Sequence, residues 1–217
     1  MQDDIRVRMR EDWNKRARED ARCYIASDVG DDDAFVTSGV RDVEFALRDL
    51  DGNWLRTTRA LEIGCGAGRM TAFLLPRVRS LCAVDVSTEM IVLARSRLGS
   101  HPNLRLMATS GSDLSEFQDR WFDFVLSYVV FQHIPKSIVR QYFRESFRLL
   151  RAEGIFRGQL ACITAPDFTP PRDHDTFSMR SWSPSEVRAE FSGWKSVVLD
   201  VIPITATTDH IWVTARR

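Results

Sequence analysis

The sequence lacks any long apolar run. None of its hydrophobic stretches reaches the roughly 20 residues that a helix needs to cross a bilayer, so we expect no membrane insertion. It also lacks an excess of charge, because 30 Lys and Arg residues balance 30 Asp and Glu residues. This balance, with basic residues scattered along the chain, predicts no nucleic-acid partner.

Cysteines are few, and they are widely spaced. The four of them, Cys23, Cys65, Cys82 and Cys162, form no C-x-x-C pair. Zinc sites usually need such pairs, so the sequence predicts no metal site. Unpaired thiols are typical of a reducing compartment, and the charged start of the chain has no signal-peptide core. The prediction is therefore a cytoplasmic protein.

Strand and helix patterns alternate along the middle of the chain, as in an α/β protein. This alternation predicts a Rossmann-like, doubly wound sheet that is mostly parallel, with right-handed crossovers and helices on both faces. With 217 residues, one sizeable core can form and still carry appendages. The predicted strands are 59–63, 80–84, 103–107, 122–126 and 155–163. The predicted helices are 70–75, one that Ser87 caps and that continues through Leu98, and about 135–150.

The N-terminal 50 residues follow a different pattern from the domain predicted at 51–217. Apolar side chains recur at every third or fourth position up to Tyr24, which predicts an amphipathic helix or helix pair. A second helix is expected from Phe35 to Leu50. This part is expected either to form a lid over a ligand, with Trp13 and Tyr24 inward, or to pack on the edge of the domain. The aspartates at 31–33 predict a helix cap rather than a metal site.

The C-terminal part also departs from the alternation. Residues 165–183 contain three prolines and predict a loop on the substrate side of the sheet. Ser183 is expected to cap a short helix that ends at Phe191. Two segments rich in β-branched residues, 196–202 and 210–215, predict a terminal antiparallel hairpin.

A glycine-rich turn follows the first predicted strand, at residues 61–68 (LEIGCGAG). Glycines there can adopt positive φ and let a ligand approach the backbone. The dinucleotide pattern G-x-G-x-x-G would need a glycine at Arg69, and no Gly-Lys-Ser/Thr follows for a P-loop. Glu62, two residues before the first glycine, could meet an amine. An ordinary strand-to-helix loop is the alternative.

Polar side chains also follow the next strands. Asp85 ends the second strand, 21 residues after Gly64, and its carboxylate could accept hydrogen bonds from a ribose diol. Asp113 follows the third strand and could accept from an adenine amine. The segment 127–135 (SYVVFQHIP) follows the fourth strand and is expected to line the reacting end. Carboxylates at strand ends often only cap helices, but here such features follow successive predicted strands in sequence order.

These motifs make residues 55–165 resemble the class I S-adenosylmethionine-dependent methyltransferases, close to the ubiquinone/menaquinone-type and small-molecule enzymes. The matching segments are 62–68 (EIGCGAG), 84–87 (VDVS) with Met90, 111–114 (GSDL), 122–127 (FDFVLS) through His133, and 149–154 (LLRAEG). The resemblance implies that S-adenosylmethionine is bound by Glu62, Gly64, Cys65, Gly66, Gly68, Asp85, Val86, Met90, Ser112, Asp113, Leu114 and Ser127. Trp13 and Tyr24 join this set if the N-terminal helices form a lid.

The implied chemistry demands little of the protein, because the donor methyl is already electrophilic and an in-line displacement mainly needs positioning. A base is required only for a protonated nucleophile, and a free imidazole titrates near ~6.5. His133 is the catalytic candidate because it is expected to open the helix just after the fourth strand, although a structural role at the pocket is the alternative. His174 and His210 are further candidates.

The predicted function is methyl transfer (EC 2.1.1) to oxygen or nitrogen of a small, aromatic or natural-product-like acceptor, by a monomer or homodimer. A protein or peptide methyltransferase, or a regulatory protein that binds the donor without transfer, are the alternatives. No Asn/Asp-Pro-Pro-Tyr/Phe motif follows the fourth strand, which disfavours methylation of base amino groups. The aromatic residues that could line an acceptor pocket are Trp13, Tyr24, Phe35, Tyr128, Phe131, Phe168, Phe177 and Trp182.

Overall fold

The computed structural model describes residues 2–26 and 31–217, with side chains from residue 5 onward. The chain divides into two compact units, 1–111 and 112–217. The boundary predicted between residues 50 and 51 concerns the role of the N-terminal helices and stays a prediction.

Three parallel strands form the sheet of the first unit in the order β3-β2-β1. Ile63 pairs with Val84, and Val84 pairs with Met107, so the carboxyl ends of the three strands meet at one edge. The glycine turn and Asp85 both lie at that edge. The strands are β1 (Arg59–Ile63), β2 (Ser80–Asp85) and β3 (Leu104–Ala108), within one or two residues of the prediction.

Helix α5 (Thr88–Leu98) packs against β2 and β3. Its start is capped as predicted, because the Ser87 hydroxyl accepts from the N–H of Met90 at 3.0 Å, and Gly99 ends it with φ 69°. The helix predicted after the glycine turn is shorter than expected. It consists of α4 (Thr71–Leu74) and a 3₁₀ turn, η1 (Leu75–Arg77), that contains Pro76.

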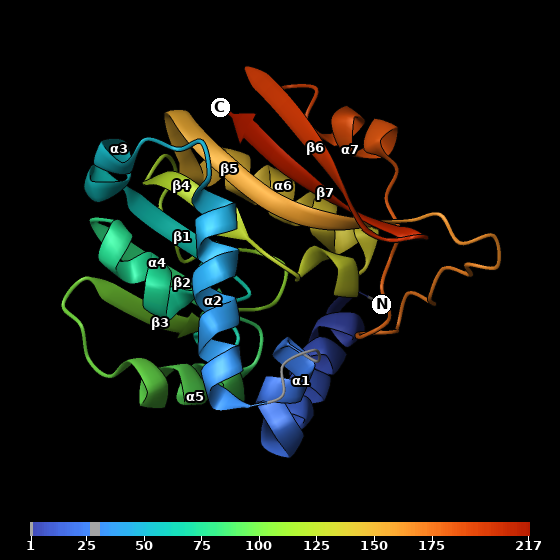
Figure 1. Cartoon of the computed structure of the whole chain (residues 1–217), viewed down its shortest axis with the longest axis horizontal. Helices are drawn as coiled ribbons and strands as arrows, with labels where there is room; N and C mark the ends of the chain where they lie inside the picture. The colour runs from blue at the N-terminus through green and yellow to red at the C-terminus, as the bar shows by residue number, and fades with distance from the viewer. Residues whose placement is uncertain (1, 27–30) are drawn as a thin grey trace. The chain divides into compact units, whose positions relative to one another are not determined.

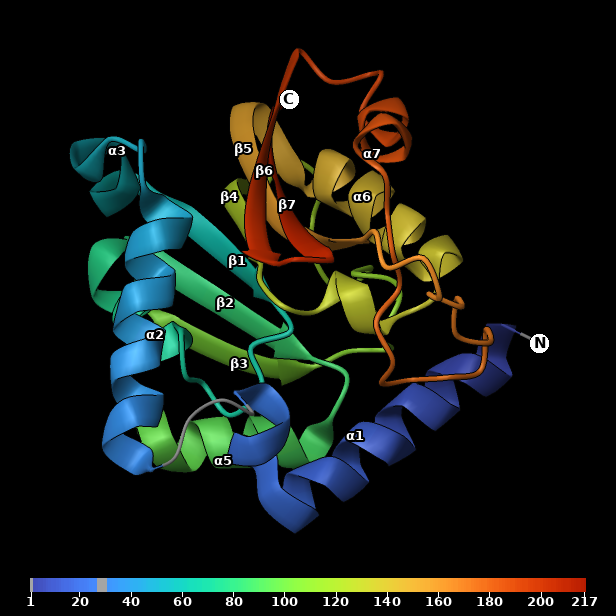
Figure 2. The same cartoon turned by 45° about the vertical axis from the view of Figure 1, so that its right-hand side comes forward.

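Helix α1 (Gln2–Ile25) runs beside α5 in both views (Figure 1, Figure 2). It is kinked at Asp20, where φ −165° and ψ 86° are not helical. The predicted amphipathic helix pair is thereby confirmed.

Helix α2 (Asp32–Leu47) begins earlier and ends earlier than predicted. Asp31 caps it, since its carboxylate accepts from the N–H of Ala34 at 2.8 Å. The expected end at Leu50 is wrong because Asp51 caps a further short helix, α3 (Gly52–Thr57), by accepting from the N–H of Asn53. An aspartate followed by glycine is compatible with a helix end or a new helix start, and here it is the start.

Four strands form the sheet of the second unit in the order β4-β5-β7-β6. β4 is parallel to β5, whereas β7 is antiparallel to both β5 and β6. The predicted C-terminal hairpin is thus confirmed, and its second strand lies between β5 and β6. The strands are β4 (Phe122–Ser127), β5 (Leu150–Ile163), β6 (Ser196–Thr205) and β7 (Thr208–Arg216).

The helices of the second unit include α6 (Lys136–Leu149), which packs against β5, and α7 (Pro184–Glu190). The predicted Ser183 cap is a full capping box, because Glu186 also accepts from the N–H of Ser183. His133 was expected to open the helix after β4. It instead ends a separate 3₁₀ turn, η2 (Phe131–His133), because Pro135 caps α6 two residues later.

These elements confirm the predicted class: a Rossmann-like α/β fold with mostly parallel strands, covering helices and an antiparallel C-terminal hairpin. Among the described residues, no helix combines the length and apolarity needed to cross a membrane.

Candidate functional site

The glycine turn after β1 is held by the neighbouring strand. The N–H groups of Gly64 and Cys65 both donate to the carbonyl of Val84, at 2.8 and 3.0 Å. Gly64, Gly66 and Gly68 have φ values of 78°, 53° and 80°, which residues with a side chain rarely adopt. The turn therefore has the backbone that the sequence predicted.

Asp85 ties the end of β2 to this turn. Its two carboxylate oxygens accept from the N–H of Gly66 and from the N–H of Ser87, each at 2.9 Å. Burial raises the pKa of Asp85, and these backbone donors oppose that rise. The carboxylate is therefore fixed in direction at the edge where the three strands end. Val86, next to it, contacts the position that a Cβ would occupy at Gly111 (φ 89°).

Glu62 is a buried carboxyl group, 5% exposed, beneath the turn. The Thr71 hydroxyl donates to it at 2.8 Å. Burial raises its pKa to about 7, and the Thr71 hydrogen bond and the positive charge of Arg69 limit the rise. Such a group changes its charge readily near neutrality. Cys65 is buried nearby, and burial raises the pKa of its thiol well above the usual value, so it is poorly suited to act as a nucleophile.

A buried ion pair braces the residue that follows the turn. The Arg69 guanidinium donates to the Asp42 carboxylate at 2.7 Å and to the Ser38 hydroxyl at 2.9 Å, joining the turn to α2. Helix α2 approaches closely because Gly39 has no side chain: a Cβ there would lie 2.7 Å from the Arg69 carbonyl oxygen. This pair could not be predicted from the sequence, since nothing local distinguishes Arg69 from a surface arginine.

Helix α1 lies on the turn and on α5. Ala17 packs with Ala67 and Met90, and Trp13 and Ile25 pack against this cluster. The Ile25 side chain lies 2.9 Å from where a Cβ of Gly66 would be. The apolar face of α1 therefore covers the glycine turn, as a lid would.

Polar contacts fix α1 in the same place. The Asn14 side-chain oxygen accepts from the Ser87 hydroxyl at 2.7 Å and from the N–H of Glu89 at 3.2 Å, so α1 helps to cap α5. The Tyr24 hydroxyl donates to Glu19 on α1 itself, and the Arg16 guanidinium lies over the rings of both Trp13 and Tyr24. Residues 1 and 27–30 of the expected lid lie outside the described residues.

The remaining predicted donor-site residues belong to the second unit. Ser112, Leu114 and Ser127 are fully buried. The N–H of Leu114 donates to Glu145 at 3.1 Å, which fixes this segment to α6. The Asp113 carboxylate accepts from the hydroxyl of Ser115 at 2.8 Å.

The segment after β4 contains an unusual backbone. Val129 has φ 56°, a conformation that is strained for a β-branched residue. Its N–H donates to the side-chain oxygen of Gln159 on β5 at 3.0 Å. Tyr128, just before it, stacks on Trp212 of β7 with ring centroids 5.3 Å apart. Neither Val129 nor Gln159 could be recognised from the sequence.

His133 uses both ring nitrogens within the second unit. Nε2 contacts the side-chain nitrogen of Gln132 at 3.2 Å, and Nδ1 contacts the carbonyl oxygen of Phe177. Its ring also stacks on the ring of Phe177. These contacts hold the imidazole in one orientation. Of the further candidates, His174 is exposed and His210 lies in β7.

The aromatic residues proposed for an acceptor pocket fall into two groups. Phe35, Phe131 and Trp182 are at most 1% exposed and belong to the cores of their units. Trp13, Tyr24, Tyr128, Phe168 and Phe177 are partly or largely exposed.

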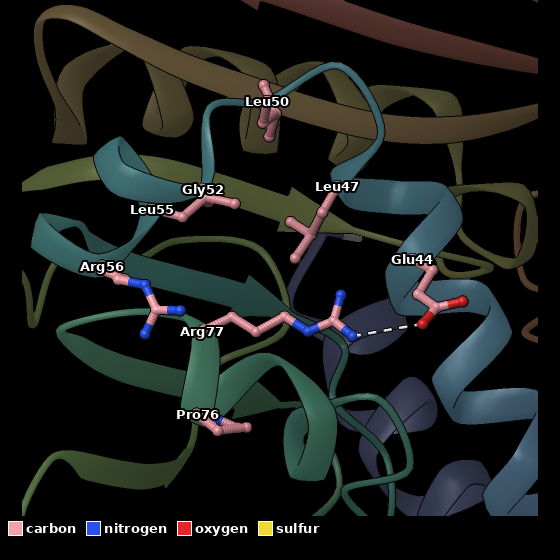
Figure 3. Close-up of a pocket in the computed structure, with 8 residues that line it drawn as sticks. All are labelled: Glu44, Leu47, Leu50, Gly52, Leu55, Arg56, Pro76 and Arg77. Carbon is pink, nitrogen blue, oxygen red and sulfur yellow. Dashed lines mark ion pairs between the residues drawn. The ribbon is translucent and has the colours of Figure 1, made fainter.

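A separate groove of about 350 Å³ lies at the opposite end of β1 (Figure 3). It is formed by the end of α2 with α3 and η1, and an ion pair between Arg77 and Glu44 (3.6 Å) lies across it. Because α3 ends just before β1 begins, this groove is remote from the glycine turn and includes none of the predicted site residues.

Comparison with known proteins finds similarity to methyltransferases. A family model described as "Methyltransferase domain" matches residues 60–154. Thiocyanate methyltransferase 1 of Brassica oleracea is 26% identical over 123 residues, which cover 56% of this chain and 54% of that protein. Ribosomal RNA small subunit methyltransferase A of Picosynechococcus sp. is 32% identical over 84 residues, 38% of this chain and 31% of that protein. The chain spans about half or less of the length of these relatives.

Similarity of structure extends over nearly the whole chain. The structure described as a DhpI–SAH complex has a TM-score of 0.64 and 19% sequence identity, and the match covers 96% of both chains. A likeness at this level of identity shows a shared fold.

Proposed function

We propose that this chain is a class I S-adenosylmethionine-dependent methyltransferase that transfers the donor methyl group to oxygen or nitrogen of a small, aromatic or natural-product-like molecule, since residues 60–154 match a family model described as "Methyltransferase domain". The observation that carries the proposal is the pair of carboxylates, Glu62 and Asp85, on either side of a glycine turn at positive φ.

The residues of the first unit suit this donor. S-adenosylmethionine carries an ammonium group, a ribose diol and a positively charged sulfur. The buried Glu62 carboxyl, with its pKa near 7, would become fully ionised beside an ammonium group. Asp85 keeps acceptor capacity beyond its two backbone donors and can hold the diol. The glycines allow the donor to approach the backbone.

Methyl transfer mainly requires that the acceptor atom be oriented correctly toward the donor methyl group. The bound donor supplies a methyl group on a sulfonium, which is electrophilic without further activation. The protein has to place the acceptor atom about 3 Å from that carbon and in line with the bond that breaks. We propose that the segment 127–135 does so, with His133 acting through its position because both ring nitrogens are already engaged.

Transfer of a labelled methyl group from the donor to a panel of phenols, carboxylates and small amines tests the proposal. Labelled product of low molecular mass is expected, and Asp85→Ala should reduce its amount when the donor is limiting. Label on polypeptide would favour the protein or peptide alternative. Tight donor binding with no transfer to any class would favour a regulatory protein.

A nucleic-acid acceptor is tested in the same assay, because one relative is named for ribosomal RNA. The positive and negative charges of the chain balance, so its net charge provides no overall attraction to RNA. Label on ribosomal RNA, with binding that weakens steeply as salt rises, would contradict the proposed small acceptor.

A further inference from the structure

A continuous chain of hydrogen bonds crosses the interior of the second unit. It runs from the N–H of Val129 to the side chain of Gln159, then to Gln132, then to His133, and ends at the carbonyl of Phe177. Gln159 is 0% exposed and Gln132 is 5% exposed, so water cannot easily replace a missing partner. We call this series of hydrogen bonds the amide relay.

The groups at the two ends of the amide relay, the N–H of Val129 and the carbonyl of Phe177, determine which atom carries each proton along it. A backbone N–H can only donate, so the Gln159 atom facing Val129 is oxygen and its nitrogen donates to the Gln132 oxygen at 3.1 Å. The Gln132 nitrogen then donates to His133 Nε2. At the far end a carbonyl can only accept, so His133 Nδ1 must carry the proton.

The amide relay connects two functional segments. One is the strained Val129 turn after β4. The other is the loop at 164–180, which Arg180 fastens to η2: its N–H donates to the Gln132 carbonyl at 2.7 Å and its guanidinium donates to the His133 carbonyl at 3.0 Å. The same guanidinium donates to the carbonyl of Asp175 within the loop at 2.7 Å.

We propose that Gln132 and Gln159 are positioning residues: they hold His133 as the Nδ1–H tautomer and couple the loop 164–180 to the turn after β4. The inference rests on the proposed function in that it treats this loop as the acceptor side. Its test reads the state of one imidazole and needs no acceptor. Failure here would therefore leave the proposed methyl transfer untouched, and failure to find an acceptor would leave the relay standing.

The first measurement is nitrogen NMR of the full chain labelled in its four histidines, with His133→Asn to assign the signal. At pH 8 we expect a protonated Nδ1 and an unprotonated Nε2 at His133. Isolated imidazole in water favours the opposite tautomer, so finding Nε2–H would overturn the proposal.

The second measurement reverses the amide relay with Gln159→Glu. The new carboxylate still accepts from Val129 and now also accepts from Gln132, whose side chain must turn its oxygen toward His133. Nε2 then needs a proton as well, so His133 should carry two protons at a pH at which the unaltered protein carries one.

A matched double variant separates this effect from simple attraction between charges. Gln132→Met with Gln159→Glu keeps the carboxylate but cuts the relay, so the second proton should be lost. If it persists, Gln132 does not transmit the effect and the proposal fails.

The third measurement concerns the loop. In Gln159→Leu, amide exchange at residues 177–180 should accelerate about tenfold, although Gln159 itself contacts none of them by a hydrogen bond described here. Ser146→Ala, a buried change on α6 outside the relay, should leave those rates unchanged. Equal effects of both variants would mean general loosening and would contradict the coupling.

Discussion

Arg69 and Asp42 form an ion pair of 2.7 Å between the segment after the glycine turn and α2, with side chains that are 6% and 9% exposed. The pair links α2 to the segment after the glycine turn, and a buried charge is costly to leave without its partner.

Removing one partner should therefore be severe. Asp42→Ala is expected to lower the free energy of unfolding by about 3–5 kcal/mol, because Arg69 keeps an uncompensated buried charge. Urea unfolding measures the change. The double variant Asp42→Leu with Arg69→Met should lose much less, and equal losses in the two proteins would show that packing rather than charge explains the effect.

The buried carboxyl of Glu62 should make stability depend on pH. Its folded pKa of about 7 exceeds the usual glutamate value of 4.5, so the folded state binds the proton more tightly than the unfolded state does. The contribution of Glu62 to stability should be greatest below pH 4.5, fall as the pH rises toward 7, and level off above it. The total change is about 3 kcal/mol. Glu62→Gln should remove this slope from denaturation curves measured across that range.

Donor binding should release a proton from the same group. Near pH 6.5 a large fraction of Glu62 is protonated, and the ammonium group of a bound donor favours the ionised form. Calorimetry with S-adenosylhomocysteine in buffers of different ionisation enthalpy should detect a release of up to about one proton. Binding without proton release, or a release that survives in Glu62→Gln, would contradict the role given to Glu62.

Asp85 should matter for affinity rather than for folding alone. Asp85→Ala is expected to weaken binding of S-adenosylmethionine by ~1.5–3 kcal/mol, the range for hydrogen bonds to a charged group. Calorimetry measures it, and a cooperative unfolding curve shows that the fold is retained. Unchanged affinity in a folded variant would remove Asp85 from the donor site.

Helix α1 should become less mobile when the donor is bound. Its apolar face already contacts the glycine turn through Ala17 and Ile25, and lids are generally segments of low local stability. Hydrogen exchange over residues 5–26 should slow on addition of S-adenosylhomocysteine. Asn14→Ala should raise the exchange rate of that segment in the free protein. Slowing at the glycine turn alone would make α1 a structural appendage.

A feature could be predicted from the sequence when a local pattern of residues is enough to locate it. Ser87 and Ser183 were identified as helix caps because a cap and its partner lie three residues apart. Glu62 and Asp85 were found because strand ends in a parallel sheet share an edge. In each case the residue stands at the end of a predicted helix or strand, and the local pattern is enough to locate that end.

Other features depend on partners far along the chain. Asn14 caps α5 across 73 positions, and Arg69 meets Asp42 across 27. Gln159 looks like any polar residue in a strand until β5 is placed beside the turn that holds Val129. The sequence of a single chain contains no local sign of these pairs, so the contacts of α1 with α5 and the amide relay were not predicted.

The place of β7 between β5 and β6 also bears on how the protein is made. Ile163 pairs with Thr208, 45 positions later, and β6 pairs with β7 alone among the described strands. While the chain leaves the ribosome, β6 emerges before its partner, and it carries exposed Val198 and Ile204. A translation stop after residue 205 would leave two strand edges unpaired, and we expect such a nascent chain to aggregate rather than to persist as a folded fragment.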